Sequence, residues 1–413
     1  MAALQFNPAD PATNADPFPT FRRLQDEDPV HWSGAVKGWV VTRYDDVRAI
    51  ALDRAMSADR VRPFLEVLPS EEQRRLADIA RYLTLWAVFK DPPDHTRLRS
   101  LMNRAFTPRA IEALRPNIAR IVDDLIDAIV AHGSADLVGD FAYPLPASVI
   151  MDMLGVPRSD LDVMKVWSDD IALFVGIARA TPGKYERAQA GTREMAAYFR
   201  RLVAERRTAP RDDMISALIA AEEEDSRLTE DEIVASCILL LFAGHETTAN
   251  LIGNGVLAFL RHPAELAKLR ARPELAASAV EECLRYDGPS GALARMVAAE
   301  HEMGGRQLKA GERVYAWMNA ANRDPRRFPD PDRFDIERAD NRHLTFGHGA
   351  HFCLGAPLAR LEAQIAFPRI FARLAGLELA ADTFEWKDSI VLRGMKKLPV
   401  RFRPVGTARK VAM

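Results

Sequence analysis

The sequence predicts a mainly α-helical fold with small β-sheets near both ends of the chain. Three observations support this class: an almost wholly helical pattern from about Pro92 to Tyr286, one very long apolar helix within it, and β-like segments in about 28–60 and 290–405. Hydrophobic residues make up 48% and charged residues 28% of the 413 residues, which is ordinary for a protein with a sizeable core. No linker or repeat divides the chain, so we expect one compact domain over residues 1–413.

The first β structure is expected close to the N-terminus. Residues 30–32 and 38–42 are rich in β-branched and aromatic residues, and Ser33-Gly34 between them supplies turn residues. This pattern predicts a hairpin. The carboxylates of Asp45 and Asp46 then favour the start of a short helix.

The helical region contains one unusually long helix. Thr229 is a candidate N-cap, and Glu232 three residues later completes a capping box. No proline follows until Pro263, so this helix should contain about 32 residues and extend ~48 Å. A helix so long and apolar must cross the centre of the molecule. Elsewhere in the region we expect breaks at Pro108, Pro144-Leu145-Pro146, Pro157, Pro182-Gly183 and Pro210, and a solvated loop at 222–227.

The last part of the chain should return to β structure. After Pro289 the sequence favours short strands and turns, followed by a final helix from about Leu354. Ile390-Val391-Leu392 and residues 398–402 are then expected to form strands.

Charge and cysteine content exclude several classes of protein. The net charge of −2 does not favour nucleic acid or an anionic membrane as a partner. The first ten residues lack the layout of a signal peptide, and the most apolar run, at 233–244, is shorter than the ~20 residues that span a bilayer. We therefore expect a cytoplasmic protein. Three cysteines without a CxxC pair predict neither a disulfide framework nor a zinc site, so any functional cysteine should act alone.

The segment from Phe346 to Gly355 singles out Cys353. Glycines on both sides allow the backbone to turn tightly and to approach a flat ligand, and the start of a helix favours a thiolate. The alternative is a free cysteine packed near a turn. The segment resembles the haem-binding loop of the cytochrome P450 family, FxxGxxxCxG, with matches at Phe346, Gly349, Cys353 and Gly355. The resemblance implies a triangular, α-rich fold with the long helix above a haem b whose iron Cys353 binds.

A segment in the predicted long helix also supports the resemblance. Ala243-Gly244-His245-Glu246-Thr247-Thr248 is similar to the family's oxygen-activating segment, which implies space for dioxygen beside Ala243 and Gly244 and proton delivery by Glu246 and Thr247. The alternative is that Thr247 bonds to the preceding turn and Glu246 pairs with an arginine.

The resemblance also assigns supporting residues. Glu282 and Arg285 match ExxR, and Arg333 lies in a PxRF-like segment, so these three are expected to form a buried structural triad. By the same resemblance, the haem propionates would be bound by His95, Arg99, Arg295 and His351.

The implied activity is insertion of one oxygen atom from dioxygen into a small, largely apolar molecule. The sequence contains no flavin or iron–sulfur motif, so a ferredoxin with its reductase, or a flavodoxin-type carrier, should supply the electrons. The enzyme itself is expected to be a monomer. Three alternatives stay open: a peroxide-driven peroxygenase, a non-catalytic haem sensor or carrier, and a helical protein without haem.

The substrate pocket is expected to be lined by residues 64–88, 163–180, 239–244, 290–293 and 391–392. These segments are mostly apolar and suit terpenoid, aromatic, fatty acyl or macrolide-like substrates. Arg62 and Arg81 could anchor a carboxylate.

Overall fold

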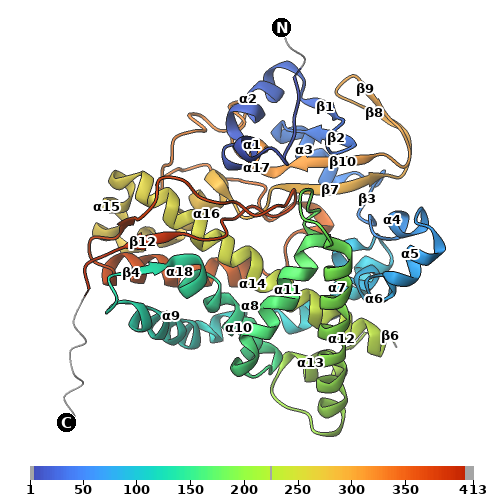
Figure 1. The fold of residues 1–413 in the computed structure, drawn as a ribbon, viewed down its shortest axis with the longest axis horizontal. Coiled ribbons are helices and arrows are strands. Elements are labelled where there is room, and N and C mark those ends of the chain that lie inside the picture. The colour runs from blue at the N-terminus through green and yellow to red at the C-terminus, as the bar shows by residue number, and fades with distance from the viewer. Residues whose placement is uncertain (1–3, 224–225, 405–413) are drawn as a thin grey trace.

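The computed structural model describes residues 4–223 and 226–404. Figure 1 shows that the largest sheet lies with the N-terminal helices at one end of the molecule, while helices fill the rest. The described helices before the long central one are α1 (Pro11–Ala15), α2 (Phe18–Glu27), α3 (Tyr44–Leu52), α4 (Arg62–Glu66), α5 (Ser70–Arg75), α6 (Ala77–Tyr82), α7 (Asp94–Ala105), α8 (Pro108–Ala113), α9 (Arg115–Ile129), α10 (Pro144–Leu154), α11 (Leu161–Val175), α12 (Lys184–Thr208) and α13 (Met214–Ala220). Those from the central helix onward are α14 (Glu230–Arg261), α15 (Pro263–Ala271), α16 (Ala276–Asp287), α17 (Met318–Ala321) and α18 (Ala356–Arg373).

The largest sheet has five strands in the order β1-β2-β10-β7-β3. The expected hairpin is present, with Trp32 opposite Trp39, and α3 follows it with Asp45 and Asp46 in its first turn. Strand β10 joins the hairpin in parallel, and the other neighbours are antiparallel. The strands are β1 (Val30–Ser33), β2 (Gly38–Val41), β3 (Met56–Ser57), β7 (Ala292–Val297) and β10 (Arg313–Trp317).

The long helix α14 confirms the prediction from its capping box. Thr229 Oγ1 accepts from the amide of Glu232, and the Glu232 carboxylate accepts from the amide of Thr229. The helix has 32 residues and crosses the middle of the molecule, where it packs on α10, α12, α16 and α18 (Figure 1). Among the described residues it is the one helix with the length and apolarity to cross a membrane, but 78% of its apolar window is buried inside the protein. It is therefore a core helix.

Several boundaries differ from the sequence-based expectation. Pro144 begins α10 rather than breaking a helix, because the first turn of a helix needs no amide donor from its residues. Ser134–Asp136 forms a strand, β4, inside the region expected to be helical, where it pairs with β12 (Pro399–Arg401), itself paired with β11 (Glu378–Leu379). Residues 390–392 form only an isolated bridge through Leu392, because their amides bond to Gly176 and Ser389 instead of to a strand.

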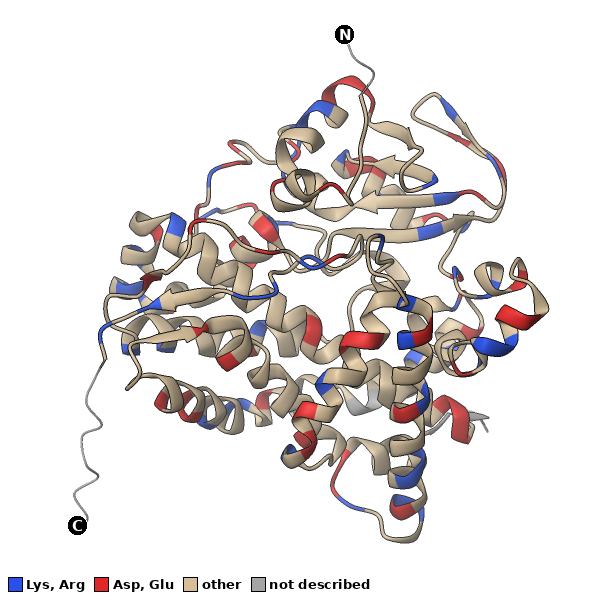
Figure 2. Cartoon of the chain, in the orientation of Figure 1, with Lys and Arg blue, Asp and Glu red and all other residues tan. Residues whose placement is uncertain are grey.

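Two small hairpins complete the β structure. Strands β8 (His301–Met303) and β9 (Arg306–Leu308) form one of them. Strands β5 (Glu222–Glu223) and β6 (Ser226–Arg227) form the other, where a loop was expected; Glu224 and Asp225 lie outside the described residues. Acidic and basic residues alternate over the outer helices rather than forming one field of a single sign (Figure 2).

Candidate active site

A large cavity lies between α14 and the segment that contains Cys353. Its empty volume is about 1800 Å³, part of which is open to solvent, and its lining side chains are mostly apolar. Ligand sites are typically lined by apolar side chains with a few polar groups, and the lining of this cavity has that character, with α14 on one side and Cys353 on the other.

The predicted pocket segments contribute unequally to this cavity. Residues 86–88, most of 239–244, and residues from 290–293 and 391–392 line it, as expected. From 163–180 only Val175 reaches it; Leu173, Phe174 and Ile177 line a smaller pocket beside it, together with Phe64.

Cys353 lies on the cavity wall between a short 3₁₀ turn, Gly349–His351, and the first turn of α18. Its amide donates to the carbonyl oxygen of Phe346 at 2.9 Å, which closes the loop on itself. Pro357 occupies the first turn of α18, as the sequence predicted. Burial raises the pKa of the Cys353 thiol, whereas the amides of Gly355 and Ala356 and the charge of Arg99 act to lower it. Backbone amides and a cation beside this half-buried cysteine are groups that stabilise a thiolate.

The glycines of this loop have different physical roles. Gly349 has φ +70°, and a Cβ placed on it would lie 2.9 Å from the side chain of Leu52 in α3. Gly355 has an ordinary negative φ and open space around a hypothetical Cβ, although it lines the cavity. Gly349 is therefore needed by the fold, while Gly355 keeps one face of the cavity flat.

Four cationic or ionisable side chains meet at one edge of the cavity. His95 and Arg99 come from α7, Arg295 from β7 and His351 from the turn before Cys353. The ring centroids of His95 and His351 are 4.0 Å apart, and His95 Nδ1 is buried without a hydrogen-bond partner in the described structure. Burial, with the nearby charge of Arg295, lowers the pKa of His351 to about 3. Because none of the described residues on the cavity wall is acidic, this edge suits an anion such as the propionates of a haem.

The middle of α14 forms the opposite wall. Ala243, Gly244 and Thr247 all line the cavity, and Ala243 is exposed to it. Thr247 Oγ1 donates to the carbonyl oxygen of Ala243 at 2.9 Å, so its hydroxyl bonds to the preceding turn. Gly244 has a packing role as well, because a Cβ there would lie 3.1 Å from the side chain of Ile150 in α10.

Glu246 lies beside this wall but not on it. Its side chain is 3% exposed, and its Oε1 is 2.5 Å from the Nζ of Lys387, so the partner is a lysine rather than an arginine. Burial acts to raise the pKa of Glu246, but the charges of Lys387 and His245 outweigh it and lower the pKa below its usual value. The adjacent His245 bonds through Nδ1 to the carbonyl oxygen of Leu241.

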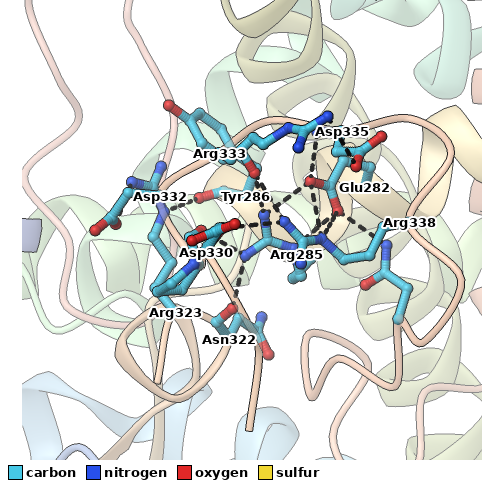
Figure 3. A network of polar contacts seen from close by, with 12 residues as sticks. Glu282, Arg285, Tyr286, Asn322, Arg323, Asp330, Asp332, Arg333, Asp335 and Arg338 are labelled. Atoms are coloured by element: carbon cyan, nitrogen blue, oxygen red, sulfur yellow. Dashed lines mark hydrogen bonds and ion pairs between the residues drawn. The ribbon is translucent and has the colours of Figure 1, made fainter. Parts of the chain in front are cut away.

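Glu282 and Arg285 form the buried ion pair that the sequence predicted. Two hydrogen bonds of 2.8 Å join their side chains, both of which are fully buried (Figure 3). Arg285 also donates to the carbonyl oxygens of Asn322, Pro331 and Arg333. The pair thereby fixes α16 to the long segment that precedes the cysteine loop.

The prediction for Arg333 was wrong. Its side chain is 61% exposed and pairs with Asp335 at 3.5 Å, so only its carbonyl oxygen belongs to the network. The adjacent Phe334 takes the inward position instead, at 2% exposed. The third charged side chain is Arg338, whose Nε lies 3.3 Å from Glu282 Oε2 (Figure 3).

A second ion pair supports the cysteine loop and was missed by the sequence interpretation. Arg360 of α18 donates to both oxygens of Glu281, at 2.7 and 2.8 Å, and its guanidinium lies 4.6 Å from the ring centroid of Phe346. His343 also contacts Glu281, at 3.2 Å. Nothing local in the sequence marks this pair, since its two members are 79 residues apart.

The comparisons with known proteins agree with this site. The family model described as Cytochrome P450 matches residues 69–272 and 268–375. The polyketide biosynthesis cytochrome P450 PksS of Bacillus subtilis strain 168 is 38% identical over 97% of this chain and 99% of that protein. The cytochrome P450 monooxygenase PikC of Streptomyces venezuelae is 42% identical over 94% of this chain and 92% of that protein. A crystal structure of P450BioI in complex with hexadec-9Z-enoic acid ligated acyl carrier protein has a TM-score of 0.88 at 38% identity, over 95% of this chain and 99% of that one.

Proposed function

This chain belongs to the cytochrome P450 family of haem b oxidoreductases, and we propose that it inserts one oxygen atom from dioxygen into a small, largely apolar organic molecule. The observation that supports this proposal best is the position of Cys353. The cysteine lies on the wall of a large apolar cavity, with a cationic edge beside it and Ala243, Gly244 and Thr247 on the other side. We further propose that the enzyme acts as a monomeric, single-domain protein in the cytoplasm.

The residues around the cavity fit a bound haem. Cys353 would hold the iron, and the propionates would be bound by His95, Arg99, Arg295 and His351. Phe346 and Gly349 would maintain the loop, and Gly355 would leave space for the macrocycle. When bound through a thiolate, a haem iron activates dioxygen because the ligand donates electron density that favours O–O cleavage.

Thr247 and Glu246 would deliver protons to the reacting oxygen. The Thr247 hydroxyl is on the cavity wall, where it could donate a proton after rotating away from the Ala243 carbonyl. Because the Glu246 carboxylate is ionised, it would first accept a proton that comes from solvent and then pass that proton to Thr247. Lys387, 25% exposed, would connect the buried carboxylate to solvent. Lys387 and Glu246 would thus carry protons from the surface toward Thr247. The apolar lining of the cavity would meanwhile exclude water from the substrate.

The lining of the cavity favours substrates with large apolar surfaces. A fatty acyl group is bound by P450BioI in the complex named above, and a polyketide is implied by the name of PksS. Either class suits this cavity, and a ferredoxin with its reductase, or a flavodoxin-type carrier, would supply the electrons.

The proposal is tested with the haem-loaded protein and its Cys353→Ala variant. Reduction with dithionite and addition of carbon monoxide should give a Soret band strongly red-shifted from that of histidine-ligated haem, and the variant should lose this band. A histidine-like spectrum in the unaltered protein would refute the assignment of Cys353.

A second measurement separates a dioxygen-dependent enzyme from a peroxygenase or a haem carrier. Product formation is compared between dioxygen with a reducing system and hydrogen peroxide alone. We expect turnover with dioxygen and its loss in Thr247→Ala. Turnover with peroxide alone would indicate a peroxygenase, and no turnover with any bound ligand would indicate a carrier.

A further inference from the structure

A smaller pocket adjoins the main cavity and is lined by positive charge. Its empty volume is about 620 Å³, part of it open to solvent, and it shares Arg60, Ala294 and Arg295 with the main cavity. Five basic side chains line it, and we call them the cationic vestibule: Arg60, Arg179, Lys184, Arg295 and Arg313. They come from four stretches of the chain, because Arg179 and Lys184 are only five residues apart, so the cluster is created by the fold.

The cationic vestibule lacks neutralising acids. None of the described residues that line it is acidic, and none of its five side chains forms an ion pair with another described residue. Burial lowers the pKa of Arg60 to about 10, and the charges of Arg313 and Arg295 contribute to the decrease. Asp388, which does not line the vestibule, is a nearby negative charge that acts on Lys184, and its carboxylate accepts hydrogen bonds from the amides of residues 179–181. Its single charge offsets only part of the positive charge of the five side chains. In the haem-loaded protein a propionate would neutralise Arg295, which leaves an excess of positive charge on Arg60, Arg179, Lys184 and Arg313. Cations in excess over nearby acids repel one another unless a further anion joins them.

Two hydrogen-bond donors in this pocket have no acceptor. The Nε of Arg179 and the hydroxyl of Tyr315 are buried without partners in the described structure, and Tyr315 is 1% exposed. A buried donor that has lost water costs about 1–3 kcal/mol unless it finds an acceptor. The pocket therefore offers a ligand both positive charge and hydrogen-bond donors that have no other acceptor.

The two arginines that the sequence suggested as anchors are already paired. Arg62 pairs with Asp59 at 3.5 Å, and Arg81 forms two hydrogen bonds with Asp231 at 2.7 and 2.8 Å. Neither lines the described cavity or vestibule. They provide control substitutions, since each is an arginine outside the vestibule whose charge is already paired with an acid.

An aromatic cluster covers one side of the vestibule. Phe64, Phe174 and Tyr185 pack on one another, with ring centroids 5.5 to 6.2 Å apart. Aromatic faces beside positive charges suit a ligand with an apolar stem and an anionic end.

We propose that the cationic vestibule binds the anionic end of the substrate, a carboxylate or a phosphate, while the substrate's apolar chain extends past Arg60 into the main cavity. This inference rests on the proposed function, because it names the substrate class of the same site. Arg313 and Lys184 are suited to contact the anion, since both line the vestibule but not the main cavity.

The test uses the haem-loaded protein and two pairs of ligands. Tetradecanoic acid is compared with its methyl ester, and monotetradecyl phosphate with tetradecanol, by calorimetric titration and by the Soret shift that accompanies loss of iron-bound water. We expect at least one anionic ligand to bind about tenfold more tightly than its neutral counterpart, and the double variant Lys184→Gln/Arg313→Gln to abolish that difference. The control Arg62→Gln/Arg81→Gln should keep it, and the Kd of the neutral ligands should stay the same in all variants.

Each outcome has one meaning. Preference for the acid or for the phosphate identifies which anionic group the vestibule accepts. Equal binding of charged and neutral ligands, or a preference that survives in the double variant, would overturn the proposal. The carbon monoxide spectrum of the same preparation tests the proposed function separately, because loss of the thiolate signature would refute that function while calorimetry still reports on the vestibule.

Discussion

The Nζ of Lys387 lies 2.5 Å from the Oε1 of Glu246, and this contact joins the C-terminal part of the chain to the middle of the central helix. Glu246 is buried, and burial acts to raise its pKa, but the charge of Lys387 is the first of several influences that lower the pKa and keep the carboxylate ionised. Removing one member of such a pair leaves an uncompensated charge inside the protein.

Lys387→Met should therefore raise the pKa of Glu246 and destabilise the protein. Because Lys387 is 25% exposed, we expect a loss of about 2 kcal/mol, below the 3–5 kcal/mol typical of fully buried pairs. Urea unfolding of the haem-loaded protein at neutral pH measures the loss. The double variant Lys387→Met/Glu246→Gln is the control and should recover most of the stability, since it removes the buried charge as well. Equal stability of the single variant and the unaltered protein would contradict the role given to this pair.

Arg338 and Arg333 offer a matched comparison five residues apart. Arg338→Gln removes a charge that contacts the fully buried Glu282, so we expect about 1–3 kcal/mol of destabilisation and faster loss of haem. Arg333→Gln should change stability by less than about 0.5 kcal/mol, because its exposed side chain contributes little and its carbonyl oxygen is retained. Chemical unfolding and transfer of haem to an acceptor protein measure the two effects. A larger effect at Arg333 would restore the original sequence-based assignment.

The features that the sequence predicted well are local ones. The capping box at Thr229 and Glu232 and the glycine pattern around Cys353 lie within a few residues of one another, so their physical roles follow from spacing. Glu282 and Arg285 were identified through their resemblance to the ExxR motif, since other pairs in the chain share the i, i+3 spacing, and their side chains do meet within one turn of α16.

The features that the sequence missed depend on contacts between distant segments. Lys387 is 141 residues from Glu246, and Arg360 is 79 residues from Glu281. Arg333 was predicted from a PxRF-like motif, and such a motif indicates a position in the chain but not the direction in which a side chain points. Likewise, Arg81 is neutralised by Asp231, 150 residues away, whereas the partner of Arg62 is the local Asp59.

The pair of Glu281 with Arg360 predicts a dependence of stability on pH. Burial acts to raise the pKa of Glu281, but hydrogen bonds from Arg360 and His343 outweigh it and lower the pKa from 4.5 to about 2. A depressed pKa contributes stability that is present above the unfolded value and is lost as the pH falls toward the folded one. At neutral pH the contribution is on the order of 3 kcal/mol.

Comparison with Glu281→Gln checks this dependence. The unaltered protein should be more stable than the variant at pH 7, and the difference should shrink as the pH falls from about 4.5 toward 2. Urea unfolding at a series of pH values measures it. A difference that stays constant down to pH 3 would show that the carboxylate is not the stabilising group.

Alanine at two glycines of the cysteine loop should change two different properties, the stability of the protein at Gly349 and haem binding at Gly355. Gly349→Ala introduces a Cβ at φ +70° and 2.9 Å from Leu52, so it should cost about 1–3 kcal/mol of stability even without haem. Gly355→Ala has no unfavourable φ and meets no atom within 4 Å, so the haem-free protein should be as stable as before. The new methyl group of Gly355→Ala would instead occupy space on the cavity wall and weaken haem binding. Thermal unfolding of the haem-free variants, together with haem titration, distinguishes the two effects. If Gly355→Ala bound haem as tightly as the unaltered protein, the macrocycle would not lie against this residue.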